Sequence, residues 1–213
     1  MNLYILFQVK ILSFMLRNIS PNYYDAVAKF KTINKIWHNI KLDSIPGDYA
    51  EFGILNGKTF LHSYQVSSKL KLDKEIKFWG LDSFEGFPVE NHNFYLSKNF
   101  KASYEKAVKR FKKYPNVEIL KGFFNDSLSS SSIKNVKKFS FVFIDCDIYE
   151  SALEIFPHIK DKLYPGAFIM IDDYSSIDKN GNSIVKAFNE VFDINKEVIV
   201  FDYFSNGIVF RLI

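Results

Sequence analysis

Two apolar runs of this chain each end in a pair of aspartates, and this pattern limits the folds that the chain can adopt. The run FSFVFI precedes Asp145 and Asp147, and the run GAFIMI precedes Asp172 and Asp173. A continuous apolar run is typical of a strand buried on both faces, as in the parallel sheet of an α/β protein. Ligands of such open sheets bind beyond the carboxyl ends of the strands. The positions of the aspartates therefore predict that the functional site lies at the carboxyl ends of these two strands.

Strand-like and helix-like segments alternate along the rest of the chain. Expected strands lie at residues 47–53, 77–82, 117–122, 139–147 and 166–173, and expected helices at residues 21–40, 58–70, 102–113, 151–163 and 183–192. Two further β-rich runs, residues 197–204 and 207–213, are joined by a turn so short that they must form a hairpin. The sequence thus predicts an α/β fold with a doubly wound, seven-stranded, mostly parallel sheet and a C-terminal antiparallel hairpin.

Charge and cysteine content narrow the class of protein. The net charge of +4 arises from 28 basic and 24 acidic residues, and the basic residues are scattered along the chain, so we expect no nucleic-acid partner. The single cysteine, Cys146, excludes an internal disulfide framework, and we expect a reducing cytoplasmic location.

The N-terminal 18 residues are apolar, but Gln8 and Lys10 interrupt the run and it is too short to span a bilayer. A helical period gives one apolar stripe, made of Leu3, Leu6, Phe7, Ile11, Phe14 and Met15. We expect this stripe to pack on the domain or on a second subunit, as in a homo-oligomer, rather than on a membrane.

The aspartates have two interpretations. Asp145 and Asp147 are two residues apart, which would place both side chains on one side of an extended strand, and Asp172 on a neighbouring strand could approach Asp145. Carboxylates without histidine or cysteine partners are typical ligands of Mg²⁺. Alternatively, Asp147 and Asp173 cap the structures that follow them, a common role of aspartate.

Weaker signals lie at two other strand ends and in one loop. Gly53, in the turn EFGILNG, would let the backbone approach a ligand closely, although the pattern is not the G-x-G-x-x-G of dinucleotide-binding proteins. Asp82 ends the next strand, where a carboxylate can accept both hydroxyls of a ribose. His92 lies in a polar loop that could cover the site, where a solvated histidine is the simpler interpretation.

Five sequence blocks resemble the macrocin O-methyltransferase (TylF-like) family of class I S-adenosylmethionine-dependent methyltransferases. They are PGDYAEFGILNGKTF, LDSFEGFP, LKGFFNDSL, IDCDIYES and YPGAFIMIDDY, which together span about residues 46–175 in the order that the family has. The resemblance implies a Rossmann-like methyltransferase fold, with residues 1–42 as N-terminal helices and residues 43–213 as the methyltransferase domain.

The resemblance also implies roles for individual residues. Glu51 and Gly53 would border the methionine part of S-adenosylmethionine, Asp82 and Ser83 would hold its ribose, and Gly122 and Phe123 would lie by its adenine. Asp145, Asp172 and Asp173 would bind Mg²⁺, with Asp145 at the reaction centre and His92 as the candidate base. The implied acceptor is a small molecule or a glycan, methylated on a hydroxyl of a sugar or glycosylated metabolite.

The segment between Pro88 and Lys101 is shorter than the lid expected in antibiotic-tailoring members, which suits an exposed sugar on a longer glycan. Two alternatives stay open. The fold could carry out another metal-dependent reaction, or it could be a non-catalytic or differently employed domain in glycan or natural-product biosynthesis.

Overall fold

A seven-stranded sheet forms the centre of the computed structural model, which describes residues 3–18, 20–90, 92 and 94–213. The strands, in spatial order, are β3 (Val117–Lys121), β2 (Phe78–Asp82), β1 (Asp48–Phe52), β4 (Phe139–Ile144), β5 (Leu163–Ile171), β7 (Gly207–Leu212) and β6 (Val198–Phe204). Neighbouring strands from β3 to β5 run parallel, and β7 is antiparallel to both β5 and β6. The predicted seven-stranded sheet with a terminal hairpin is confirmed.

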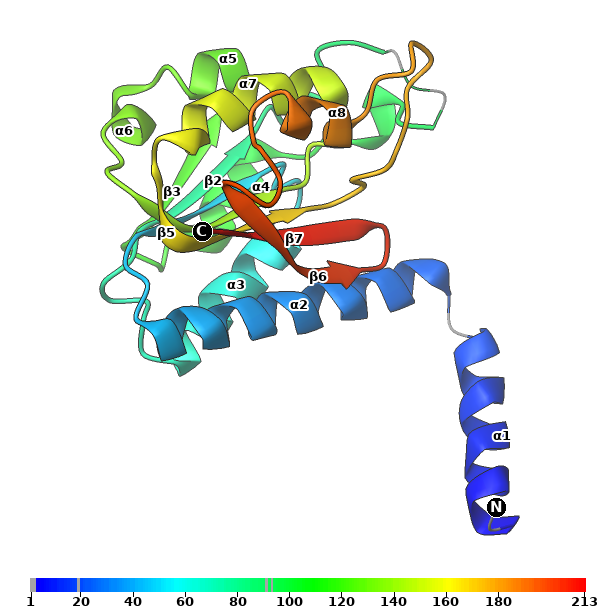
Figure 1. Cartoon of the computed structure of the whole chain (residues 1–213). Coiled ribbons are helices and arrows are strands. Elements are labelled where there is room, and N and C mark those ends of the chain that lie inside the picture. Colours follow the sequence, from blue (N-terminus) through cyan, green and yellow to red (C-terminus); the bar gives the residue numbers. More distant parts are fainter. Residues whose placement is uncertain (1–2, 19, 91, 93) are drawn as a thin grey trace.

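Helices cover both faces of the sheet (Figure 1). The helices are α1 (Leu3–Asn18), α2 (Pro21–Asp43), α3 (Lys58–Lys69), α4 (Tyr104–Phe111), α5 (Phe124–Ser127), α6 (Ser131–Lys134), α7 (Tyr149–Lys160) and α8 (Ile184–Asn189), with a 3-10 turn at Ser97–Asn99. Strand β4 shows why two helical layers are needed. Val142 and Ile144 belong to the core beneath α7 and α8, whereas Phe141 and Phe143 belong to the core beneath α2 and α3.

Helix α2 packs along the sheet as part of this second core. Ser20 caps its N-terminus by accepting a hydrogen bond from the backbone N–H of Tyr23, and Pro21 at the first position suits a helix start. Its side chains Ile33, Ile36 and Trp37 are fully buried. The indole of Trp37 donates a hydrogen bond of 2.7 Å to the hydroxyl of Ser63 on α3, so the buried polar group is satisfied.

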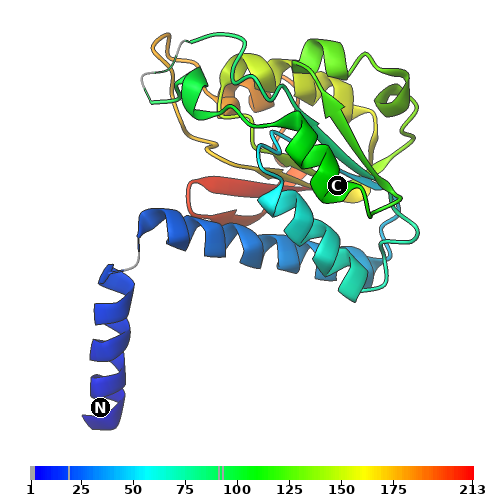
Figure 2. The same cartoon turned by 180° about the vertical axis from the view of Figure 1, so that it is seen from behind.

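Helix α1 projects away from the body of the molecule (Figures 1 and 2). Of the predicted apolar stripe, Phe7 and Phe14 are each 62% exposed and Ile11 is 46% exposed. The side chains of Leu3, Leu6 and Met15 lie outside the described residues. These three side chains of the stripe are therefore largely exposed. No helix within the described ranges is both long and apolar enough to cross a membrane.

Several element boundaries differ from the sequence prediction. Helix α7 begins at Tyr149 and ends at Lys160, strand β5 begins earlier at Leu163, and α8 is shorter than expected. The four-residue helices α5 and α6 were not predicted, because one turn of helix leaves no periodic pattern to detect.

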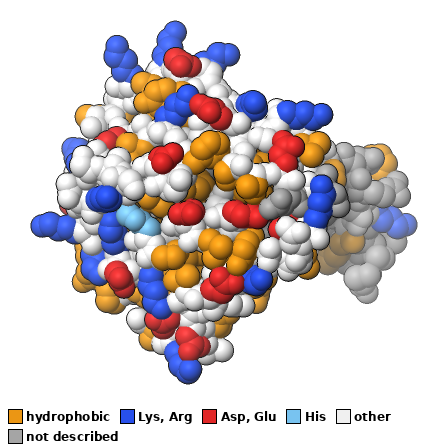
Figure 3. Space-filling view, turned by 90° about the horizontal axis from the view of Figure 1, so that it is seen from above, with side chains coloured by type: hydrophobic (Ala, Val, Ile, Leu, Met, Phe, Trp, Pro, Cys, Tyr) orange, Lys and Arg blue, Asp and Glu red, His pale blue; other side chains and the backbone are white. Residues whose placement is uncertain are grey.

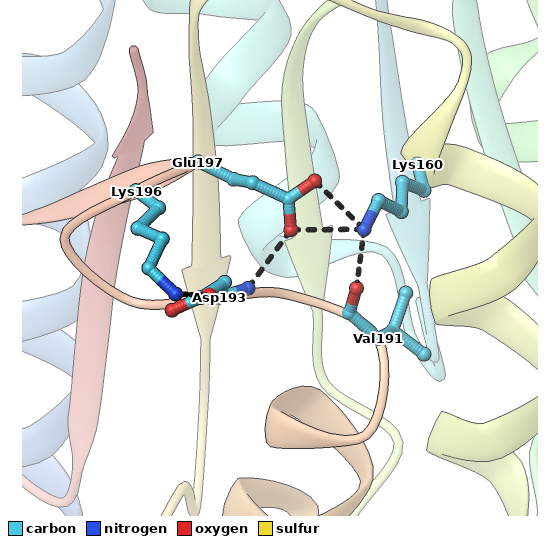
Figure 4. A network of polar contacts seen from close by, with 5 residues as sticks. All are labelled: Lys160, Val191, Asp193, Lys196 and Glu197. Atoms are coloured by element: carbon cyan, nitrogen blue, oxygen red, sulfur yellow. Dashed lines mark hydrogen bonds and ion pairs between the residues drawn. The ribbon is translucent and has the colours of Figure 1, made fainter.

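A polar network ties the connection between α8 and β6 to the end of α7 (Figure 4). The amine of Lys160 donates to the carbonyl of Val191 at 2.5 Å and pairs with the Glu197 carboxylate at 2.8 Å. Glu197 also accepts the backbone N–H of Asp193 at 2.9 Å. These contacts hold the loop that leads into the terminal hairpin.

Candidate active site

The register of the central strands aligns the residues that follow them. Phe52 of β1 pairs with Ile144 of β4, and Ile144 pairs with Ile171 of β5. The next residues, Gly53, Asp145 and Asp172, consequently form a row across the carboxyl edge of the sheet. The backbone N–H of Asp145 donates to the Phe52 carbonyl at 2.8 Å, and that of Asp172 donates to the Ile144 carbonyl at 2.9 Å.

A cavity of about 850 Å³ opens above this row. The predicted site residues on its wall are Gly53, Asp82, Ser83, Gly122, Phe123, Asp145, Asp172 and Asp173. The start of α2, the loop after β2, helix α5, the start of α7 and the turn between β6 and β7 also contribute to the wall. Glu51 and His92 are not among the lining residues.

Gly53 lies directly against the backbone that follows β4. Its φ of +96° is strained for residues with a side chain, and a Cβ there would lie 1.8 Å from the carbonyl oxygen of Asp145. Only glycine fits this position. The turn after β1 and the turn after β4 are therefore in direct backbone contact.

Asp82 organises two turns with one carboxylate. Its Oδ2 accepts the backbone N–H of Leu55 at 2.7 Å, and its Oδ1 accepts that of Phe84 at 2.6 Å. Burial raises its pKa, and these two hydrogen bonds oppose the shift. Each carboxylate oxygen can accept a further hydrogen bond, so Asp82 can also bind a ligand's hydroxyls. Ser83 beside it donates to the carbonyl of Gly86 at 2.6 Å.

Glu51 lies beneath the cavity wall rather than on it. Its carboxylate is fully buried and accepts the hydroxyls of Tyr49 and Thr59, each at 2.5 Å. Burial raises its pKa to about 7, although the two hydrogen bonds lower it. In this structure Glu51 supports the turn that carries Gly53.

The four aspartates form two contacting pairs. The Asp145 side chain lies beside that of Asp172, and the Asp147 side chain lies beside that of Asp173. Burial raises the pKa of Asp145 to about 7. Burial also raises the pKa of Asp147, and the negative charges of Asp173 and Asp172 raise it further. Crowded carboxylates of this kind attract a cation.

The structure corrects two parts of the sequence interpretation. Strand β4 ends at Ile144, and Asp147 has a left-handed φ of 61°, so Asp145 and Asp147 do not extend from one strand with period two. The capping alternative is also wrong for Asp147, because Ile148 is the N-cap of α7. Asp173 does begin a turn, in which its backbone carbonyl accepts the N–H of Ser176 at 3.0 Å.

Lys29 of α2 contributes a positive charge to the acidic cluster. Its ammonium forms an ion pair with Asp172, and a second one with Asp25 at 3.2 Å. Burial lowers its pKa, but the charges of Asp145 and Asp172 outweigh that effect and raise it overall. Sequence reasoning missed Lys29, because no local pattern shows that this helix position reaches the sheet edge.

The chemistry of the donor set fits a magnesium ion, since hard carboxylate oxygens are its usual protein ligands. Across the described ranges, however, no three His, Cys, Asp or Glu side chains are arranged to hold a metal ion. Lys29 instead contacts the carboxylate of Asp172.

His92 joins the loop after β2 to the loop after β5. Its Nδ1 accepts the backbone N–H groups of Phe94 and Tyr95 at 3.1 and 3.3 Å, and its Nε2 lies 3.1 Å from the hydroxyl of Ser176. Because Nδ1 accepts, Nε2 carries the proton and donates to Ser176. Both ring nitrogens are thus engaged away from the cavity.

Acidic side chains stand among hydrophobic ones near the middle of the face seen in Figure 3. Basic side chains lie mainly around the outline of this face rather than in one patch.

Solved structures identify the class of this fold. The O-methyltransferase NovP superposes with a TM-score of 0.70 at 21% sequence identity, covering 87% of this chain and 80% of NovP. The fold is thus the Rossmann-like fold of O-methyltransferases.

The sequence then identifies the family. The model of the family described as Macrocin-O-methyltransferase (TylF) matches residues 26–211, and the chain belongs to this family. It is 27% identical over 151 residues to 8-demethyl-8-(2,3-dimethoxy-alpha-L-rhamnosyl)-tetracenomycin-C 4'-O-methyltransferase of Streptomyces olivaceus, covering 62% of this chain and 55% of that enzyme. It is 22% identical over 173 residues to mycinamicin III 3''-O-methyltransferase of Micromonospora griseorubida, covering 72% of this chain and 66% of that enzyme. The matches thus span 55% and 66% of the length of these two relatives.

Proposed function

We propose that this protein is an S-adenosylmethionine-dependent O-methyltransferase that requires Mg²⁺ and acts on a hydroxyl of a sugar or glycosylated metabolite. The observation that carries the proposal is that Asp82, Asp145 and Asp172 line the same cavity. Asp82 also holds the turns after β1 and β2 by accepting one backbone N–H from each. The part of the cavity around Asp82 suits a nucleoside, and the part around Asp145 and Asp172 suits a polar acceptor. Membership of the macrocin O-methyltransferase family supports the same reading.

The cofactor half of the cavity is built from three strand ends. Asp82 would accept the ribose hydroxyls, Gly53 would let the backbone approach the methionine part, and Gly122 with Phe123 would lie by the adenine. The bound S-adenosylmethionine supplies an electrophilic methyl group on its sulfonium. Glu51 would act indirectly, because its carboxylate is occupied by Tyr49 and Thr59 beneath the turn.

The acceptor half is the acidic cluster. Asp145, Asp172 and Asp173 would hold Mg²⁺, which when bound makes a coordinated hydroxyl easier to deprotonate. Asp145 lies on the cavity wall and would receive the proton from the acceptor hydroxyl. His92 is the weaker candidate for the base, since both of its nitrogens are already engaged.

Exposed aromatic rings favour a sugar as the acceptor. Tyr24 and Phe94 both line the cavity, and they are 60% and 76% exposed. Flat aromatic faces of this kind can cover the C–H side of a sugar ring. The names of the two relatives above describe methylation of a rhamnosyl compound and of mycinamicin III. By analogy, we propose a small-molecule or glycan acceptor for this chain.

Calorimetric titration of S-adenosylhomocysteine into the full chain, in the presence of Mg²⁺, tests the proposal. We expect a dissociation constant on the order of micromolar. The variant Asp82→Asn keeps the shape of the side chain but removes its charge and one acceptor, so we expect at least about tenfold weaker binding. A folded protein that does not bind S-adenosylhomocysteine would contradict the assignment.

A further inference from the structure

Helix α2 brings an ammonium group to the carboxylates that would bind the metal. Lys29 is only 16% exposed in its side chain, and its partner Asp172 is 4% exposed. Among the described residues that line the cavity, Lys29 is the sole lysine or arginine. Its positive charge also attracts the carboxylate of Asp145, which follows strand β4. One helix of the N-terminal region thus places a cation in the acidic cluster.

A divalent cation and this ammonium cannot share the cluster in its present arrangement. The ammonium contacts Oδ2 of Asp172, an oxygen that a metal ion would also need. Two cations in contact with one carboxylate would also repel each other strongly in this buried setting. Metal binding through that oxygen therefore requires Lys29 to leave.

The ammonium already has a second carboxylate partner that is more exposed to solvent. Asp25 lies one helical turn before Lys29, and its Oδ2 is 3.2 Å from the lysine nitrogen. The Asp25 side chain is 31% exposed, compared with 4% for Asp172. The flexible four-carbon stem of lysine allows the ammonium to swing toward Asp25 and solvent without any movement of α2.

We propose that Lys29 is a displaceable counter-cation: it compensates the carboxylate cluster when no metal is bound and withdraws to Asp25 when a divalent cation enters. Lys29 then lowers the affinity for metal, since binding must break its ion pair with Asp172. In return, it limits the repulsion between buried carboxylates in the metal-free protein. This inference rests on the proposed function, because it assumes that the cluster binds Mg²⁺.

Metal titrations of matched variants test the role of Lys29. Lys29→Met keeps an unbranched stem without the charge, and Lys35→Met is the control, because Lys35 lies on the same helix and pairs with Asp202 outside the cavity. In calorimetric titrations with MnCl₂ and with MgCl₂, we expect Lys29→Met to bind at least about tenfold more tightly than the wild type. We expect Lys35→Met to match the wild type. Equal or weaker metal binding by Lys29→Met would overturn the proposal.

Thermal unfolding with and without MgCl₂ gives a second measurement. We expect Lys29→Met to melt below the wild type without metal and to regain most of the difference at saturating metal. If the variant does not fold without metal, folding rescued by MgCl₂ supports the proposal, whereas a loss that metal does not repair overturns it.

Binding of S-adenosylhomocysteine, measured on the same samples, separates this inference from the proposed function. If wild type and Lys29→Met bind S-adenosylhomocysteine but neither binds metal, the counter-cation role is overturned and the methyltransferase assignment stands. If tighter metal binding by Lys29→Met is seen without S-adenosylhomocysteine binding, the role of Lys29 is supported and the assignment fails.

Discussion

At the scale of single residues, Asp145 is the side chain on which the proposed chemistry depends most. It lies on the cavity wall beside Asp172, and its backbone carbonyl contacts the turn at Gly53. Its carboxylate could serve as metal ligand and as proton acceptor, and asparagine could do neither well.

We expect Asp145→Asn to lower the rate of methyl transfer at least about a hundredfold. S-adenosylhomocysteine affinity should stay within about threefold, because the ribose is expected to bind at Asp82. Methyl transfer from labelled S-adenosylmethionine and calorimetry measure the two quantities. Asp161→Asn, on the exposed end of α7, is the control and should match the wild type. Full activity of Asp145→Asn would contradict both proposed roles of this residue.

Glu51 links the stability of the fold to pH. Its pKa is about 7 in the folded chain, against a reference value of 4.5 for the unfolded chain. Between these values the folded state binds more protons than the unfolded state, so the contribution of Glu51 to stability falls as pH rises. The difference of about 2.5 units corresponds to a loss on the order of 3 kcal/mol.

Glu51→Gln removes this titration, so its free energy of unfolding should depend less steeply on pH between about 4.5 and 7. Urea unfolding at several pH values within and above this window measures the slope for both proteins. Identical slopes would show that Glu51 does not titrate in this pH range. Its carboxylate would then stay ionised in the folded chain, stabilised by its neighbours.

Residue contacts also show where sequence reasoning stops. The approach of Asp145 and Asp172 was foreseeable, because both follow strands of a parallel sheet. The contact of Lys29 with Asp172 was not, because it depends on how α2 crosses the sheet, and the two residues lie more than 140 positions apart in the sequence.

At the scale of elements, side-chain contacts of His92 with Ser176 and of Tyr95 with Ser176 and Asp173 hold the loop after β2 over the site. Gly86, Phe87 and Tyr95 from this loop line the cavity. A short segment thus covers part of the site, although the sequence suggested an exposed acceptor. The contacts themselves could not be predicted, because neither loop has a periodic pattern.

His92→Ala and Ser176→Ala should have similar effects if the histidine only tethers the loop. We expect each variant to raise the KM for the acceptor a few-fold and to change kcat less than about threefold. Steady-state kinetics with one acceptor measures both parameters. A loss of kcat of a hundredfold or more in His92→Ala alone would instead identify His92 as the base.

At the scale of the whole molecule, the seven strands and the terminal hairpin followed from the sequence. Buried strands leave long apolar runs, and the short turn between the last two strands allows only a hairpin. The position of α1 did not follow. Its apolar pattern predicted packing, yet Phe7 and Ile11 are exposed and the helix stands away from the body. The homo-oligomer contact through α1 and the cytoplasmic location remain predictions.

Deletion of residues 1–19 should leave the fold intact, because α1 projects away from the sheet and its helices. We expect a melting temperature within about 2 °C of the full chain. Exposed apolar side chains favour self-association, so we expect the full chain to form oligomers and the shortened chain to be monomeric. Light scattering measures the mass of both. Equal masses would show that α1 has another role.

The way Asp82 ties two turns together has a consequence for how such a protein can evolve. One carboxylate fixes the backbone after both β1 and β2, so the donor side of the site can hardly be altered in small steps. Another part of the rim comes from the first turns of α2 and from the later part of the loop after β2, from Phe87 to Phe100, where side chains can be exchanged without disturbing the strands. New acceptor preferences can therefore arise by substitutions on that rim while the nucleoside pocket is inherited unchanged.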